Sequence, residues 1–320
     1  MLRFEIALLV KLGFFLIPKI VKLTLDTVLI SFAIPYYENE ALLTKAIESV
    51  LSQTSSNWRL LISLDLEFSD TFKKYLNNLN DIRISVVSNE VQGICQNWNN
   101  CLRQVTTEYL TILHSDDELE PDYVATMESL IERYPENVLY FCGAQIIDSD
   151  SQPLFSFADS IKGLLAPKGN IIRLNGDRGL SSLLKGCYIM CPTICYRSEV
   201  IKKYAFRDKW QMVLDLDLYS RLLFDGHSFI GIRDKAYRYR RHGNNQTLKL
   251  TNNFKRFDEE IGLYNEINKL ASIFNWWRTV KVSRKKTILK LHLIYLFFES
   301  LMHFNFKRSM KILAYIARHF

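Results

Sequence analysis

Between residues 27 and 147, short apolar runs alternate with longer segments whose apolar residues recur about every 3.6 positions. This alternation is typical of a parallel or mixed sheet with helices on both faces. Few other folds are open to such a chain, because parallel neighbours in a sheet need a crossover, usually a helix, between them. The predicted strands are 27–35, 58–65, 82–88, 108–114 and 137–147, and the predicted helices are 40–53, 69–79, 93–105 and 122–134.

The alternation stops at residue 148. The stretch 148–180 shows no clear element, which is typical of an active-site cover or an inserted subregion. A strand and a helix are then predicted over 191–206, a helix over 215–226 and an edge strand over 236–242. We therefore predict three parts: an apolar, basic N-terminal helical segment (1–25), an α/β domain (26–250) and a basic amphipathic helical tail (251–320).

The formal charge of +7 is unevenly distributed, because residues 261–320 carry +9 and residues 1–25 carry +3, which leaves −5 for 26–260. A nucleic-acid-binding protein would place positive charge along its functional groove, so this acidic body argues against that class. Basic, apolar ends fit an anionic membrane surface. Packing of the C-terminal helices on the body, or a homodimer through them, is the open alternative.

The six cysteines do not form a zinc-binding pattern. Cys187, Cys191 and Cys195 recur every four residues, but Pro192 interrupts any helix that would align them. We expect buried, reduced thiols instead. The apolar start of the chain shows no small-residue cleavage site, so the sequence predicts a cytoplasmic protein, peripheral on the inner face of the membrane.

Two adjacent carboxylates, Asp116 and Asp117, end one of the apolar runs. Like charges at this distance repel unless a cation, a helix N-terminus or water stabilises them. One interpretation is a helix cap, because Ser115 and Glu118 have capping-box spacing and Pro121 suits a first helical turn. The other interpretation is a divalent metal site, and the local sequence leaves both open.

Further polar residues follow other predicted strands. In open α/β sheets, ligands bind at the carboxyl ends of the strands. Pro35 and Asp65 lie at such ends, and Asp65 could accept hydrogen bonds from a base or a ribose. A second acidic pair, Asp215 and Asp217, begins a predicted helix, and His242 follows the last predicted strand as a candidate metal ligand or phosphate contact.

Four motifs in this order resemble those of the inverting family two glycosyltransferases of the GT-A fold. The resemblance covers roughly residues 28–248. The motifs are "ISFAIPYYENEALLTKAIESVLSQT", "GICQNWNNCLRQVTTEYLTILHSDDEL", "DLDLYSRLLFDGHSF" and "YRYRRHGNNQT".

This resemblance implies a Rossmann-like α/β fold, a nucleotide-diphosphate sugar donor, and Mn²⁺ or Mg²⁺ as cofactor. It implies that Asp215 is the catalytic base, with Asp217 as the alternative two residues away. The implied donor-binding residues are Pro35, Tyr37, Glu40, Asp65, Asn99, Asp116 and Arg240, and the implied metal ligands are Asp116, Asp117 and His242.

The chain departs from the family pattern at three positions near these residues. His114 stands where many relatives have the first acid of the acidic motif, and an imidazole can serve there as a neighbour or a ligand. Leu64 stands where relatives commonly have an acid before Asp65, and Leu214 replaces the acid that often precedes the base.

The function implied by the resemblance is transfer of a sugar to a saccharide or lipid-linked acceptor in surface polysaccharide synthesis. Two alternatives remain at this point. One is transfer to a polyprenyl phosphate, and the other is a non-catalytic relative that only binds the nucleotide-sugar.

Overall fold

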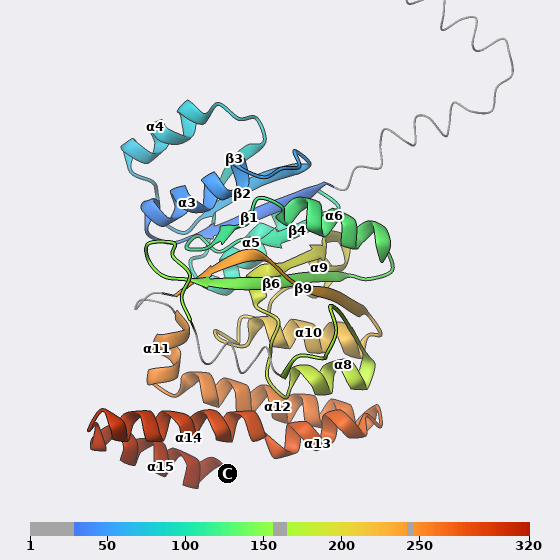
Figure 1. The fold of residues 1–320 in the computed structure, drawn as a ribbon, viewed down its shortest axis with the longest axis vertical. Helices are drawn as coiled ribbons and strands as arrows, with labels where there is room; N and C mark the ends of the chain where they lie inside the picture. The colour runs from blue at the N-terminus through green and yellow to red at the C-terminus, as the bar shows by residue number, and fades with distance from the viewer. Residues whose placement is uncertain (1–28, 156–164, 242–245) are drawn as a thin grey trace, which may run out of the picture.

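The structure is a computed structural model that describes residues 29–155, 165–241 and 246–320. Within these residues, nine strands form one mixed sheet in the order β3-β2-β1-β4-β8-β6-β9-β5, with β7 paired to β9 (Figure 1). The first four strands pair in parallel, as the alternation predicts. They are β1 (Ile30–Tyr36), β2 (Trp58–Leu64), β3 (Ile84–Ser88) and β4 (Tyr109–Ile112).

The second half of the sheet is mostly antiparallel. β8 (Ile194–Arg197) pairs antiparallel with β4 and with β6 (Leu139–Ile147), and β9 (Ser228–Arg240) runs parallel to β6. β5 (Glu118–Leu119) and β7 (Ile171–Asn175) both pair antiparallel with β9.

The predicted edge strand at 236–242 is therefore wrong in its position. Residues 236–240 form the end of β9, where Tyr237 pairs with Leu119 of β5 on one side and Ala144 of β6 on the other. Arg238 and Arg240 can lie within the sheet because their guanidinium groups bond to an acidic side chain and to a backbone carbonyl of the fold. The stretch 148–180, for which the sequence predicts no element, contains β7 and the first turn of a helix.

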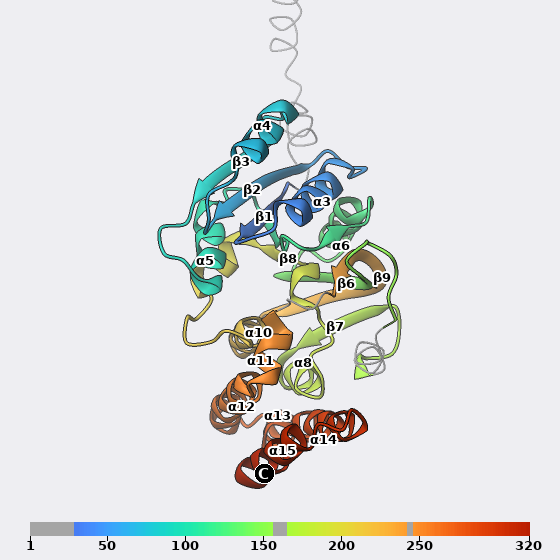
Figure 2. The same ribbon diagram turned by 90° about the vertical axis from the view of Figure 1, so that its left-hand side faces the viewer.

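Helices cover both faces of the sheet, which confirms the predicted α/β class. Apolar residues of α3 (Glu40–Leu51), α4 (Asp70–Leu79) and α6 (Tyr123–Arg133) form one core with β1 and β2. The other core contains side chains of α5, α8, α9 and α10. Figure 2 shows α3 and α5 on opposite sides of β1. These helices are α5 (Ile94–Gln104), α8 (Gly176–Leu183), α9 (Ser198–Tyr204) and α10 (Leu214–Phe224).

The C-terminal part of the chain is helical, as predicted. It contains α11 (Gln246–Asn252), α12 (Lys255–Ile273), α13 (Trp277–Lys285), α14 (Thr287–Met302) and α15 (Phe306–His319). These helices lie at the end of the molecule opposite β3 and α4 (Figure 1).

The first of these helices pack directly on the α/β domain. Leu263, Ile267 and Ala271 of α12 enter the same core as α10. The Asp177 carboxylate of α8 accepts hydrogen bonds from the N–H groups of Arg278 and Thr279 in the first turn of α13, at 3.2 and 2.8 Å. A carboxylate is favourable at a helix N-terminus, so α12 and α13 are joined to the domain by both apolar and polar contacts.

The predicted N-terminal helical segment, 1–25, lies outside the described residues. Among those that are described, no helix combines the length and the apolar character that crossing a bilayer requires. All six cysteines are free thiols, four of them buried, as their pattern predicts.

Candidate active site

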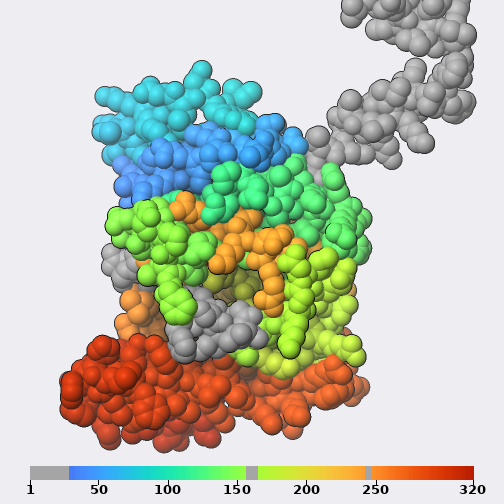
Figure 3. All heavy atoms as spheres, viewed as in Figure 1, coloured from blue at the N-terminus to red at the C-terminus, as the bar shows by residue number. Residues whose placement is uncertain are grey.

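One cleft of about 1930 Å³ lies at the carboxyl ends of β1, β2 and β4. This is the edge of an open α/β sheet where ligands are expected. Figure 3 shows the molecule from the side seen in Figure 1, with the C-terminal helices across one end. The cleft brings together five residues that the sequence predicts for the site, from four separate elements: Pro35, Tyr37, Asp65, Asp116 and Asp215.

Asp65 is held at the tip of β2 by its neighbours. Its N–H donates to the Tyr36 carbonyl at 2.9 Å, which extends the β1–β2 pairing by one residue. Its carboxylate accepts hydrogen bonds from Asn89 Nδ2 at 2.6 Å and from the Gly93 N–H at 3.1 Å. Carboxylate oxygens have about four lone-pair sites, so Asp65 retains acceptor capacity toward a ligand in the cleft.

The acidic motif forms a turn between β4 and β5. The Asp117 N–H donates to the His114 carbonyl at 3.2 Å, which closes the turn. Glu118 then enters β5, while α6 begins only after Asp122, whose side chain makes no capping bond. The helix-cap interpretation of the acidic pair is therefore wrong, because Ser115 and Glu118 do not belong to a helix N-terminus.

Asp117 is the buried member of the pair, with 1% of the residue exposed. Its Oδ1 accepts the Arg240 N–H at 2.7 Å and its Oδ2 accepts the Tyr237 hydroxyl at 3.0 Å. Burial and then the charge of Asp116 raise the pKa of Asp117 well above its usual range, and these two hydrogen bonds lower it. A nearby cation would favour the charged form of this carboxyl group.

His114 completes a possible metal site with the two aspartates. Ligand atoms of His114, Asp116 and Asp117 all lie within 4.8 Å of one another. The His114 Nε2 is buried and has no hydrogen-bond partner among the described residues. Burial lowers the pKa of His114, so its imidazole is in the neutral form that binds metals. The predicted ligand His242 lies outside the described residues.

These donors fit a divalent cation. Two carboxylates suit Mg²⁺ or Mn²⁺, and an imidazole beside them favours Mn²⁺, the metal that binds nitrogen more strongly. The His114 ring also packs 5.6 Å from the ring of Trp98, which keeps water away from one side of it.

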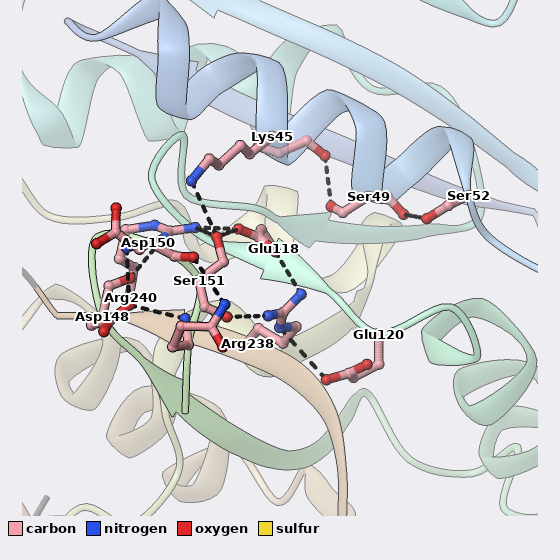
Figure 4. Close-up of polar contacts among 12 residues, drawn as sticks. Lys45, Ser49, Ser52, Glu118, Glu120, Asp148, Asp150, Ser151, Arg238 and Arg240 are labelled. Carbon is pink, nitrogen blue, oxygen red and sulfur yellow. Dashed lines mark hydrogen bonds and ion pairs between the residues drawn. The ribbon is translucent and has the colours of Figure 1, made fainter. Parts of the chain in front are cut away.

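Arg240 stabilises the acidic motif from its buried side, away from the cleft. Only 1% of this residue is exposed. Its Nε donates to the Asp116 carbonyl at 2.8 Å. Its guanidinium pairs with Glu118 and also bonds to the Asp148 carbonyl (Figure 4). Side chains alternate along a strand, so the neighbours Tyr239 and Arg241 line the cleft while Arg240 does not.

Glu40 and Asn99 also lie outside the cleft lining. The Glu40 carboxylate accepts the Ser69 N–H at 2.6 Å and the Ser69 hydroxyl at 2.7 Å, which ties α3 to the start of α4. Asn99 forms two bonds with the Phe206 backbone, at 2.8 and 2.9 Å. The cleft is lined instead by Asn39 and Asn97. The local sequence does not show which of Asn97 and Asn99 faces the cleft, because this depends on how α5 is oriented in the fold.

The two acids of α10 have different environments. Asp215 is half-buried and lines the cleft. Asp217 is fully buried, and its carboxylate accepts bonds from Arg207 Nε at 2.9 Å, Arg221 Nε at 3.0 Å and Trp210 Nε1 at 3.2 Å. Asp217 and Arg221 are four residues apart on the helix, and their ion pair lies largely inside the protein. This geometry favours Asp215 as the acid that meets a substrate.

The buried environment of Asp217 gives a stability prediction. Asp217→Ala should lower the free energy of unfolding by about 3 kcal/mol, because Arg207 and Arg221 lose their buried partner. Urea denaturation followed by circular dichroism measures this change. Asp215→Ala is the control and should change the free energy of unfolding by less than about 1 kcal/mol. Equal stability of the two variants would contradict this role for Asp217.

The mixed sheet, the helices on both its faces and the acidic turn at its ligand-binding edge have the arrangement of the GT-A fold. The family model described as glycosyl transferase family 2 matches residues 31–204, more than half of the chain. The chain belongs to this family.

Two relatives are similar to parts of the chain. The UDP-Glc:alpha-D-GlcNAc-diphosphoundecaprenol beta-1,3-glucosyltransferase WfgD of Escherichia coli is 26% identical over 183 residues, which are 57% of this chain and 65% of WfgD. The GalNAc(5)-diNAcBac-PP-undecaprenol beta-1,3-glucosyltransferase of Campylobacter jejuni is 31% identical over 125 residues, 38% of this chain and 39% of the relative. The chain therefore spans less than two thirds of either relative.

Two solved structures share the fold. The structure of S. aureus TarS 1-349 in complex with UDP-GlcNAc has a TM-score of 0.58 at 15% identity, over 76% of this chain and 66% of the TarS 1-349 chain. The mannosyltransferase PcManGT from Pyrobaculum calidifontis, in complex with GDP-Man and Mn²⁺, has a TM-score of 0.58 at 10% identity, over 91% and 86% of the two chains. At these identities the similarity concerns the fold alone.

Proposed function

We propose that this chain is an inverting, divalent-metal-dependent glycosyltransferase that moves a sugar from a nucleotide-diphosphate donor to a saccharide or lipid-linked acceptor. Its setting would be surface polysaccharide synthesis. The observation that carries this proposal is that Asp65, Asp116 and Asp215, from separate elements, line the same cleft. The lipid diphosphates in the names of the two bacterial relatives support the choice of acceptor.

In this proposal Asp65 holds the nucleoside, and His114, Asp116 and Asp117 hold the metal. When bound, the metal would stabilise the negative charge of the leaving diphosphate. Asp215 accepts the proton of the acceptor hydroxyl while that oxygen forms a bond to the anomeric carbon and the diphosphate oxygen leaves with its electron pair. One displacement of this kind inverts the configuration at the anomeric carbon.

A thermal-shift screen tests donor binding. Nucleotide-diphosphate sugars with Mn²⁺ are added to the full chain, and the donor is expected to raise the melting temperature. A ligand at 100 times its Kd stabilises a protein by about 2.7 kcal/mol. If no nucleotide-sugar shifts the melting temperature with or without Mn²⁺, the proposed function is contradicted.

His114 leads to a prediction about metal preference. After EDTA treatment, Mn²⁺ should restore the affinity for UDP about tenfold better than Mg²⁺, because an imidazole ligand favours Mn²⁺. His114→Asp should remove most of this preference, since it leaves only oxygen ligands. Isothermal titration calorimetry with UDP measures both effects, with the exposed His319→Asp as the control. Equal restoration by both metals in the unmodified chain would contradict His114 as a ligand.

We also propose that the protein is peripheral on the cytoplasmic face of the membrane. The support is the charge of the tail, where Lys and Arg exceed Glu by nine over residues 261–320. Each such residue near an anionic surface contributes about 1 kcal/mol. A homodimer through the C-terminal helices is the alternative, and sedimentation with phosphatidylglycerol vesicles at low and high salt separates the two.

A further inference from the structure

The cleft that contains Asp116 and Asp215 continues beyond them to the C-terminal helices. The part of the cleft between Asp215 and α14, here named the distal arm, is lined on its far side by residues of α14. They include Ile288, Leu291, His292, Tyr295 and Glu299. A nucleotide-sugar at the strand ends would leave this arm open, so the arm is placed to receive an acceptor.

An exposed apolar stripe runs along α14 and reaches the distal arm. The stripe residues are spaced by three or four positions, which places them on one side of the helix. Between 43% and 70% of each is exposed, whereas Leu289, Leu293 and Leu296 on the other side are buried. The stripe consists of Leu291, Ile294, Tyr295, Phe298 and Met302.

Two stripe residues connect the exposed surface to the site. Leu291 and Tyr295 belong both to the stripe and to the cleft lining. The stripe and the distal arm are therefore continuous at these two side chains. A second protein copy on the same stripe would cover the mouth of the arm that leads to Asp215, and this argues for a lipid as the occupant.

Cationic side chains also line the distal arm. Lys249, Arg256 and Arg308 face it, against Glu260 and Glu299. Arg256 Nε bonds to Glu260 at 3.0 Å, and Arg308 donates to the Asn252 side chain at 3.0 Å. A guanidinium has five N–H donors, so both arginines keep donors for an anion, and the three cations exceed the two acids by one charge.

We propose that the distal arm binds a lipid-diphosphate-linked acceptor. Its saccharide reaches Asp215, its diphosphate contacts Lys249 and Arg308, and its polyprenyl chain lies along the α14 stripe. This inference rests on the proposed function, because it assigns the acceptor of the same site. The occupant is one membrane lipid with a phosphorylated head, and the contact does not require a helix that crosses the bilayer.

Vesicle flotation tests this assignment with the full chain. Phosphatidylcholine vesicles carry either a small fraction of undecaprenyl diphosphate or enough phosphatidylglycerol to match its charge. The protein is expected to bind the undecaprenyl diphosphate vesicles about tenfold more tightly than the phosphatidylglycerol vesicles. The double variant Leu291→Gln, Phe298→Gln should lose this difference. The control Ile82→Gln, Val86→Gln replaces two exposed apolar residues on and beside β3, at the opposite end of the molecule, and should keep it.

Three results would overturn the assignment. Equal binding to both kinds of vesicle would mean that the protein binds anionic membranes in general and does not recognise the lipid diphosphate. Unchanged selectivity in the stripe variant would exclude the stripe, and loss of a dimer in that variant by light scattering would assign the stripe to a second copy. Calorimetry with UDP and Mn²⁺ on the same proteins separates the two proposals, because failure of donor binding concerns the proposed function and not the distal arm.

Discussion

Asp215→Asn is expected to lower kcat by about 10²-fold or more, because it removes the proposed general base and preserves the shape of the side chain. The Kd for UDP with Mn²⁺ should stay unchanged, since the acidic turn that would hold the metal lies on a different element. Steady-state release of nucleoside diphosphate measures kcat, and calorimetry measures the Kd. A change in kcat without a change in donor affinity is the signature of a group that acts in the transition state.

Asp225→Asn is the matched control for this experiment. Asp225 follows α10 and accepts a hydrogen bond from the Tyr204 hydroxyl at 2.7 Å, away from the cleft lining. It should retain near-normal turnover. Near-normal turnover of Asp215→Asn would instead show that Asp215 is not the general base. Asp217 could not take this role, because it is buried and accepts hydrogen bonds from three side chains.

Asp116→Ala should weaken metal-dependent UDP binding by about 100-fold or more, since loss of an outer-shell partner of a metal ligand alone typically costs 10–100-fold. Asp116 is half-buried on the turn after β4, so the fold should tolerate this change. Calorimetry with UDP, with Mn²⁺ and with EDTA, measures the effect. Asp122→Ala removes a carboxylate six residues away that does not line the cleft, and it is the control.

Asp117 requires a different substitution. Its removal by Ala would leave the Arg240 N–H and the Tyr237 hydroxyl without their acceptor. Each unsatisfied buried group costs about 1–3 kcal/mol. The double replacement of Asp116 and Asp117 by Ala would therefore mix lost binding with lost stability, whereas Asp116→Ala isolates binding. Unchanged Mn²⁺-dependent affinity in Asp116→Ala would contradict the metal site.

Much of the fold and part of the site follow from the sequence because they depend on local patterns. The change between apolar periods of about 2 and about 3.6 marks strands and helices without knowledge of their partners. Residues directly after strands then meet at one sheet edge. Pro35, Asp65 and Asp116 could be grouped in this way, and the structure places all three in one cleft.

The positions that sequence reasoning placed less well depend on side-chain direction. Arg240 and Arg241 are neighbours, but alternation along β9 directs one behind the acidic turn and the other to the cleft. Asn97 and Asn99 are two residues apart on α5, and the orientation of that helix decides which one reaches the cleft. No pattern in the sequence specifies these directions, because they are set by long-range pairing.

The packing of the C-terminal helices is also a long-range property. Periodicity shows that α12 has an apolar side but not what that side contacts. Ala271 is fully buried in the core shared with α10. A truncation near this residue would remove α13 and its contact with Asp177, so point substitutions on α14 test the tail more cleanly than a shortened chain does.

The most direct test of the central claim is nucleoside diphosphate release from a panel of nucleotide-diphosphate sugars, with bacterial lipid extract as the source of acceptor. We predict that one donor releases its nucleoside diphosphate only when Mn²⁺ and the extract are both present, and that Asp215→Asn loses this release. No release from any donor, although UDP binds through Asp116 and Mn²⁺, would contradict the account and indicate a protein that binds nucleotide-sugars without transferring them.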